Sequence, residues 1–506
     1  MLSTRPVNAT GRQRRIFWIL VTLAILVPIF IPSGRARADA PPNYLGSLPA
    51  GTLTSEIPTL SDPTETWELY LPKGYTATRR WPVLLLFDPR SRGRLAAELF
   101  RSAADEFGWI LASSDNTMSD GPSEPNGRAL KAMIPDVMKR LPVDERRIYA
   151  GGFSGGAVLA WTVGLKGTFL AGVISISGRP APEHLALTPK FALFAAAGTE
   201  DFNFQATREL DRIAIQAGAP HRLETFPGPH SWCPPEMARN AVRWLQLLAM
   251  QTGIAPPDPT LIETAFRDEL AAADAFEQSG NSLAAGRKLA EVAATFHGLG
   301  DPAAIRAAEV RSARLLAEPA AKSSVKEEVA AEKYELLAFR RIDEAVRLVR
   351  DSEVPVPAGE LRHTLALDDA LRRRAGGGLG GAAAGRALAM MDVHLTFYLM
   401  RDLFAANRFR DAIPGLKLMT EVFPEDARSL YNLACAEARG GSTADALIAL
   451  SRALDQGLDS PAQLETDADL SALRDKPGFA DLVARARALN GAPRAAAPAA
   501  SSPTPP

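Results

Sequence analysis

The sequence has very few cysteines and almost no net charge. Its 506 residues include two cysteines and six histidines, and 57 basic residues nearly balance 58 acidic ones. Two cysteines cannot supply a disulfide framework or a four-ligand zinc set. A formal net charge of −1 gives no electrostatic footprint for nucleic acid or for an anionic membrane surface. No metal-ligand spacing and no phosphate-cradling loop is present either. We therefore expect no nucleic-acid partner, no metal and no organic cofactor.

The start of the chain has the features of an export signal. Three arginines between residues 12 and 15 precede the apolar run "IFWILVTLAILVPIFI", and "PSGRARADA" follows it. A basic start, a short apolar stretch and a small-residue cleavage site are typical of a secretory signal peptide. We predict that residues 1–38 are removed before Asp39, which places the protein in the periplasm or outside the cell. The alternative is an uncleaved inner-membrane anchor, although this run is short for a full span.

Short apolar runs alternate with helical patterns between residues 60 and 250. The runs "WPVLLLFDP", "RRIYAGG", "AGVISISG" and "KFALFAAAG" are those expected of strands buried on both faces. Their alternation with helices indicates βαβ units and a mostly parallel sheet. We predict an α/β domain at residues 60–255, preceded by a linker at 39–59.

The sequence changes character after "QTGIAPPDP", where strand-like runs end and alanine-rich helical patterns begin. "RFRDAIPGLKLMTEVFP" and "STADALIALSRALDQGL" align with an offset of 34 residues, which is the tetratricopeptide spacing. Residues 430–485 resemble a tetratricopeptide-type module. We predict an α-helical region at 256–390, TPR-like repeats at 391–490 and a disordered tail at 491–506. A protein partner would bind through the TPR-like repeats.

One serine lies among close-packed glycines in "YAGGFSGGAV", directly after a predicted strand. Gly152, Ser154 and Gly156 form a G-x-S-x-G motif, which is typical of a sharp strand-to-helix turn that exposes a nucleophilic serine. A Cβ two residues before or after the serine would collide with the other side of the turn. The backbone N–H of Gly155 would then point into an oxyanion hole at a helix N-terminus. The alternative is a glycine-rich turn with a spectator serine.

A nucleophilic serine needs a base, and the base needs an acid that orients it. In the α/β-hydrolase fold they follow in the order serine, acid, histidine. Asp201 in "GTEDFN" follows one predicted strand, and His230 in "PGPHSW" follows the next. Glu200 is the alternative acid. His221 is the alternative base, but it opens a strand and does not follow one.

The stretches "GGFSGGA", "AGVISISG", "GTEDFN" and "PGPHSW" occur in one order over residues 60–250. This region resembles an α/β-hydrolase of the esterase group that includes carboxylesterase/phospholipase-like and polyhydroxybutyrate-depolymerase-like enzymes. The resemblance implies that Ser154 is the nucleophile, Asp201 the acid and His230 the general base.

The chain departs from this family at the end of the predicted strand "WPVLLLFDP", which matches the family's third strand, after which the second oxyanion donor normally lies. Relatives carry histidine–glycine there, whereas this chain has Asp88 and Pro89. Proline has no N–H to donate. We therefore expect the backbone N–H of Arg90 to be the second donor.

These features predict an exported serine hydrolase that cleaves a carboxylic ester through a Ser-His-Asp triad and an acyl-enzyme. The substrate would be a small-molecule or polymer ester. A peptidase with the same triad is one alternative. Another is an exported helical-repeat scaffold whose hydrolase-like domain is not catalytic.

Export predicts a defined mature end. Because "ARADA" precedes the expected cleavage point, protein from the cell envelope should begin near Asp39. N-terminal sequencing of the envelope fraction measures this directly. Intact Met1 in the membrane fraction would show instead that the segment is an anchor.

Overall fold

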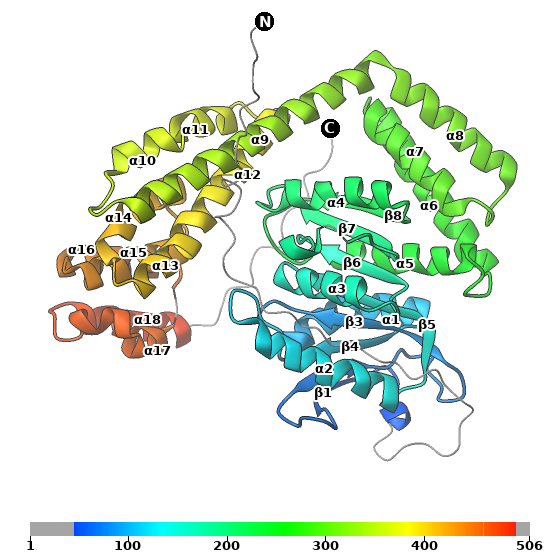
Figure 1. Ribbon diagram of the computed structural model, residues 1–506, viewed down its shortest axis with the longest axis horizontal. Coiled ribbons are helices and arrows are strands. Elements are labelled where there is room, and N and C mark those ends of the chain that lie inside the picture. The colour runs from blue at the N-terminus through cyan, green and yellow to red at the C-terminus, as the bar shows by residue number, and fades with distance from the viewer. Residues whose placement is uncertain (1–44, 186, 459, 492–506) are drawn as a thin grey trace, which may run out of the picture. The chain divides into compact units, whose positions relative to one another are not determined.

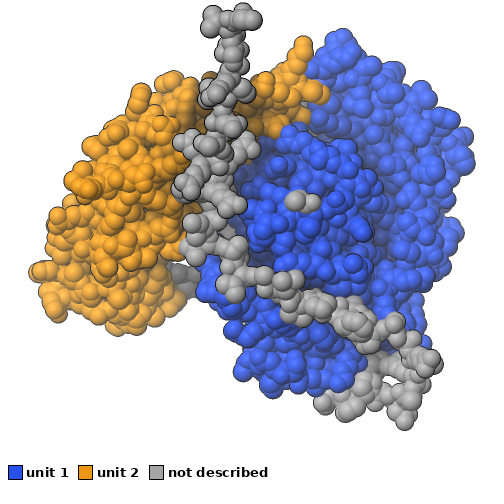
Figure 2. All heavy atoms as spheres, in the orientation of Figure 1, with its two compact units in different colours: residues 1–323 blue, residues 324–506 orange. Residues whose placement is uncertain are grey.

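A computed structural model describes residues 45–185, 187–458 and 460–491 of the chain. The predicted signal peptide, the first six residues of the predicted linker (39–44) and nearly all of the predicted tail lie outside these residues. Within the described ranges, no helix is both long and apolar enough to cross a membrane. The chain divides into two compact units, residues 1–323 and 324–506 (Figure 2).

The first unit is built on a sheet that has eight strands within the described residues (Figure 1). The strand order is β1-β2-β4-β3-β5-β6-β7-β8. β2 pairs antiparallel with both β1 and β4, and all other neighbours pair in parallel. The strands are β1 (Leu53–Pro58), β2 (Thr66–Tyr70), β3 (Trp81–Phe87), β4 (Ile110–Ser114), β5 (Val143–Phe153), β6 (Gly172–Ile176), β7 (Ala192–Gly198) and β8 (His221–Phe226).

Helices cover both faces of this sheet, which explains the continuous apolar runs. They are α1 (Gly93–Phe107), α2 (Ser123–Arg140), α3 (Gly155–Lys166), α4 (Phe204–Ala217) and α5 (Pro235–Gln251). Val83 and Leu85 of β3 belong to the core that includes residues of α2, α3 and α4. Leu84 belongs to the core on the other face, with residues of α1 and α5. The α/β fold class with a mostly parallel sheet is confirmed.

The first compact unit continues past the predicted domain boundary at residue 255 and ends at residue 323. It takes in three further helices, α6 (Pro259–Gln278), α7 (Ser282–Phe296) and α8 (Pro302–Ala317). Leu247 and Met250 of α5 share an apolar core with Ile262 of α6 and Leu289 of α7. The end of α5 is therefore buried by helices that the sequence pattern assigns to another region.

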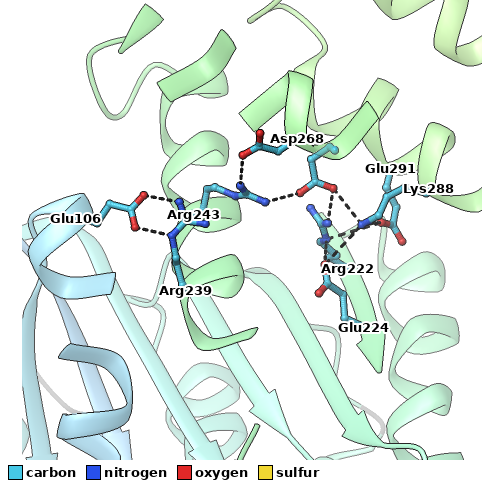
Figure 3. A network of polar contacts seen from close by, with 9 residues as sticks. Glu106, Arg222, Glu224, Arg239, Arg243, Asp268, Lys288 and Glu291 are labelled. Atoms are coloured by element: carbon cyan, nitrogen blue, oxygen red, sulfur yellow. Dashed lines mark hydrogen bonds and ion pairs between the residues drawn. The ribbon is translucent and has the colours of Figure 1, made fainter. Parts of the chain in front are cut away.

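A network of buried charges also joins these helices to the sheet (Figure 3). Arg222 of β8, only 4% exposed, donates a hydrogen bond to Glu269 of α6 at 2.7 Å. Arg243 of α5 donates to the same carboxylate at 3.0 Å. The Lys288 ammonium of α7 lies 3.0 Å from it as well. One carboxylate thus holds a strand and two helices together.

The second unit is helical throughout its described residues. The long helix α9 (Pro319–Asp351) leads into it, and its other helices are α10 (Ala358–Thr364), α11 (Leu367–Ala375), α12 (Gly378–Val393), the π-helix η3 (His394–Leu399), α13 (Met400–Ala405), α14 (Phe409–Val422), α15 (Ala427–Gly440), α16 (Thr443–Asp455), α17 (Pro461–Thr466), the 3₁₀-helix η4 (Ala468–Leu473) and α18 (Phe479–Gly491). An all-α region after the α/β part is as predicted.

The two sequence segments that align with an offset of 34 residues form α14 and α16. Ala412 and Leu416 of α14 are buried, and so are Ala446 and Leu450, which take the same places in α16. α15 packs against both helices. The apolar positions of the repeat are therefore core positions, and its tetratricopeptide character stays a prediction.

Glu269 should be essential to the stability of the first unit. Glu269→Gln removes the charge that pairs with Arg222 and Arg243 while it keeps the side-chain shape. Breaking a buried ion pair in this way costs about 3–5 kcal/mol. Urea unfolding of the full chain, followed by circular dichroism, measures the loss.

The control is Glu309→Gln, because Glu309 pairs with Arg306 on an exposed surface. Such a pair contributes about 0–1 kcal/mol.

Burial opposes the ionisation of Glu269, but Arg222 and Lys288 outweigh it and lower its pKa from 4.5 to about 2. The contribution of Glu269 should thus be complete above pH 4.5 and lost as the pH falls toward 2. Equal stability of the two variants at pH 7 would contradict this role.

Candidate active site

Ser154 occupies a strained turn between β5 and α3. Its φ of 54° and ψ of −121° lie outside the conformations that residues other than glycine readily adopt. The turn needs glycine on both sides of the serine. An ideal Cβ on Gly152 would lie 2.2 Å from the carbonyl of Gly156, and one on Gly156 would lie 2.0 Å from the Phe87 oxygen. The G-x-S-x-G spacing is therefore a steric requirement of this backbone.

The structure brings the three predicted triad residues into one hydrogen-bonded chain. Ser154 Oγ lies 2.9 Å from His230 Nε2. His230 Nδ1 lies 2.9 Å and 3.1 Å from the two carboxylate oxygens of Asp201. Asp201 follows β7 and His230 follows β8, at the same edge of the sheet as Ser154. With Nδ1–H donated to the carboxylate, Nε2 can accept the serine proton.

Asp201 is held in place from a second side. Its side chain is fully buried, and Oδ1 also accepts a hydrogen bond from the backbone N–H of Asn203 at 2.7 Å. The Asn203 side chain in turn donates to the Ser177 carbonyl at 3.0 Å, which ties the acid loop to the end of β6. Sequence reasoning did not identify Asn203, although aspartate commonly accepts a hydrogen bond from the backbone N–H two residues later in a turn.

The two alternative residues lie elsewhere. Glu200 is exposed. His221 Nδ1 donates a hydrogen bond to the Ala219 carbonyl at 2.9 Å, and its Nε2 lies 3.3 Å from Asp211 Oδ1. The hydrogen bond that His221 donates to Asp211 raises the pKa of His221 above its ordinary value. The geometry thus favours Asp201 and His230 over both alternatives.

Aromatic rings enclose the imidazole of His230. Its centroid lies 4.6 Å from the Phe153 ring and 4.3 Å from the Phe202 ring. Trp232 packs on Phe153 with a centroid distance of 5.7 Å. The imidazole is therefore oriented by ring packing as well as by Asp201. Phe202 follows the acid directly in sequence, and no motif had marked it.

Asp88, at the end of β3, connects the histidine loop to the loop after β3. Its side chain is fully buried, and Oδ2 accepts hydrogen bonds from Trp232 Nε1 at 2.8 Å and Arg92 Nη2 at 2.9 Å. Oδ1 accepts from the Arg90 backbone N–H at 2.8 Å and from Arg92 Nε at 3.0 Å. This carboxylate thus fixes two loops that border Ser154.

The hydrogen bond to Asp88 runs contrary to the predicted role of Arg90. Its N–H points to Asp88 Oδ1 and is already used, so it is not free to bind an oxyanion. The physical reason is local, because aspartate commonly accepts from the N–H two residues on. The pair Asp88–Arg90 carried that signal in the sequence.

Gly155 has the position expected of the first oxyanion donor. It is the first residue of α3, and the N–H groups of a first helical turn have no partner within the helix. An ideal Cβ on Gly155 would lie 2.3 Å from Ser119 Cβ. Glycine is therefore required here by the loop after β4, which the sequence had not indicated.

Within the described residues, no three His, Cys, Asp or Glu side chains are grouped so that they could hold a metal ion. Cys233 lies three positions after His230 and is buried. Burial raises the pKa of its thiol to about 12, so it remains protonated at neutral pH.

Comparisons with solved structures find likenesses to the α/β part. A fluorophosphonate-binding serine hydrolase of Staphylococcus aureus is 14% identical, with 39% of this chain and 99% of that chain covered and a TM-score of 0.33. A ferulic acid esterase is 16% identical, with 39% and 96% covered and a TM-score of 0.32. An esterase of the archaeon Pyrobaculum calidifontis is 14% identical, with 42% and 88% covered and a TM-score of 0.32.

No family model and no curated protein matches the chain.

Asp88→Asn should loosen both loops. The amide keeps the shape of the carboxylate but turns an NH₂ group toward donors, and it removes the partner charge of Arg92. Hydrogen bonds to a charged group contribute about 1.5–3 kcal/mol each, so we expect a stability loss of that order in urea unfolding. Glu98→Gln, which removes an exposed pair with Arg101, is the control. A change no larger than that of the control would contradict the role of Asp88.

Proposed function

We propose that the α/β unit is a serine hydrolase that cleaves carboxylic esters. The observation that carries the proposal is the continuous hydrogen-bonded chain from Ser154 through His230 to the buried Asp201. A serine hydroxyl is a poor nucleophile at neutral pH unless an adjacent base takes its proton. The arrangement of base and orienting acid around Ser154 has the geometry that this activation requires.

The reaction would proceed in two halves. Ser154 Oγ attacks the ester carbonyl carbon while His230 Nε2 takes the hydroxyl proton, and Asp201 stabilises the imidazolium that forms. The carbonyl electron pair moves to oxygen, where the Gly155 N–H donates to it. The tetrahedral intermediate collapses, His230 protonates the departing alcohol, and an acyl-enzyme remains. Water, deprotonated by His230, then releases the acid by the same steps.

Two features prepare the imidazole for this role. Asp201 holds the tautomer in which Nε2 is free to accept a proton. Phe153 and Phe202 pack against the ring and limit its rotation. The strained φ of Ser154 keeps Oγ in front of the α3 N-terminus, which favours negative charge on the attacked carbonyl.

Export and partner binding are separate parts of the proposal. Residues 1–38 have the composition of a signal peptide, which supports action in the periplasm or outside the cell. The paired helices α14–α16 support a protein partner for the second unit, since tandem helical repeats present extended binding surfaces.

The triad can be tested by substitution. Ser154→Ala and His230→Ala should each lower kcat on p-nitrophenyl esters by roughly 10⁴- to 10⁶-fold, and the double variant should lose little more because the residues act as a unit. Asp201→Asn should cost roughly 10⁴-fold because it favours the wrong imidazole tautomer. A panel of short-chain, long-chain and feruloyl esters provides the rates.

Glu200→Gln is the matched control, because Glu200 neighbours the acid but is exposed. It should leave kcat unchanged. A fluorophosphonate probe should label wild-type protein and not Ser154→Ala. Wild-type turnover by Ser154→Ala would rule out the mechanism. An unlabelled wild type would favour the scaffold alternative.

A further inference from the structure

The loop after β3 has no backbone donor to spare for an oxyanion. Pro89 has no N–H, and the N–H groups of Arg90 and Arg92 donate to Asp88 Oδ1 at 2.8 Å and 3.3 Å. The Ser91 N–H donates to the Thr117 carbonyl at 2.9 Å. Over residues 89–92, all of which the structure describes, every backbone N–H is thus engaged. These four residues therefore leave no backbone N–H for a second oxyanion donor.

Ser119, in the loop between β4 and α2, lies against the first donor. An ideal Cβ on Gly155 would lie 2.3 Å from Ser119 Cβ and 3.3 Å from Ser119 Oγ. This contact places the Ser119 hydroxyl beside the residue whose N–H opens α3. Ser119 therefore lies next to Gly155, the residue that follows the catalytic serine in the chain.

The backbone around Ser119 is fixed by neighbouring segments. Its own N–H donates to the Pro89 carbonyl at 2.9 Å. The Asn126 side chain accepts from the Met118 N–H at 2.8 Å and donates to the Met118 carbonyl at 2.7 Å. The Ser119 N–H is therefore engaged with Pro89, whereas the side-chain hydroxyl can still rotate toward another acceptor.

We propose that Ser119 Oγ–H is the second oxyanion donor of this hydrolase. The inference rests on the proposed function, since it names a further catalytic residue for the same reaction. As the bond between Ser154 Oγ and the carbonyl carbon forms, the carbonyl electron pair moves onto oxygen. Ser119 donates a hydrogen bond to that oxygen and transfers no proton, so its own O–H bond stays intact.

Ser119 has an alternative acceptor in the resting structure. Its hydroxyl donates to Asp120 Oδ2 at 2.7 Å, in an exposed position. A hydroxyl turns about its bond to Cβ and selects the stronger acceptor. The oxyanion of a tetrahedral intermediate carries its negative charge on one oxygen and is a stronger acceptor than a solvated carboxylate, whose charge is shared by two. The donor is thus free to move from Asp120 to the transition state, where its contribution raises kcat.

Ser119→Ala tests the proposal because it removes only the hydroxyl. The Cβ that packs on Gly155 and the N–H that binds Pro89 both remain. Loss of one oxyanion donor lowers kcat by about 10²- to 10³-fold, and we expect KM to stay within a few-fold of wild type. Affinity for a trifluoromethyl ketone, whose serine adduct carries an oxyanion, should fall by a similar factor. Ser119→Thr, which restores a hydroxyl, should recover most of the lost rate.

Ser91→Ala is the matched control, because it removes a hydroxyl that donates to the Thr117 carbonyl in the neighbouring loop. It should leave kcat and inhibitor affinity unchanged. If Ser119→Ala keeps both values near wild type, or changes KM alone, Ser119 is not an oxyanion donor. If the wild type neither reacts with a fluorophosphonate nor hydrolyses any ester, the proposed function itself fails, and this inference fails with it.

Discussion

The close approach of two backbones at Gly156 is the constraint on which the site depends. Because a Cβ there would lie 2.0 Å from the Phe87 oxygen, only glycine lets α3 begin directly beside the end of β3. That contact sets the sharp turn at Ser154 and points the first N–H groups of α3 past the serine. The loops after β3 and β4 must then fit around this helix start, and Ser119 meets Gly155 as a result.

Asp88 fixes the loops around this turn. A buried carboxylate is costly unless it is paired and hydrogen-bonded, and here the guanidinium of Arg92, the indole of Trp232 and two backbone N–H groups satisfy it. The same bonds join the histidine loop to the end of β3. Asp88 stands where the esterases that the sequence resembles carry histidine–glycine, and it is the residue that holds the two loops together.

Much of the candidate site follows from the order of the chain. Strands of a parallel sheet end at one edge, so residues that follow successive strands meet there, and this is why Asp201 and His230 could be placed beside Ser154. The use of the Arg90 N–H does not follow from the order of the strands, because it depends on how the Asp88 side chain turns back on its own loop. The sequence pattern also did not indicate that the first compact unit extends past residue 255 to residue 323. The partner of Arg222 lies 47 residues farther along the chain, and hydrophobic periodicity contains no information about such a pair.

The shared carboxylate of Glu269 has a consequence for the timing of synthesis. Arg222 lies just before the histidine loop and Arg243 lies after it, and both bind a residue that the ribosome adds later. Domains form largely in the order in which the chain emerges. The turns that hold Ser154 and Asp201 can therefore form before Glu269 is available to bind the two arginines on either side of the histidine loop. The two arginines on either side of the histidine loop therefore gain their shared partner only after α6 has emerged.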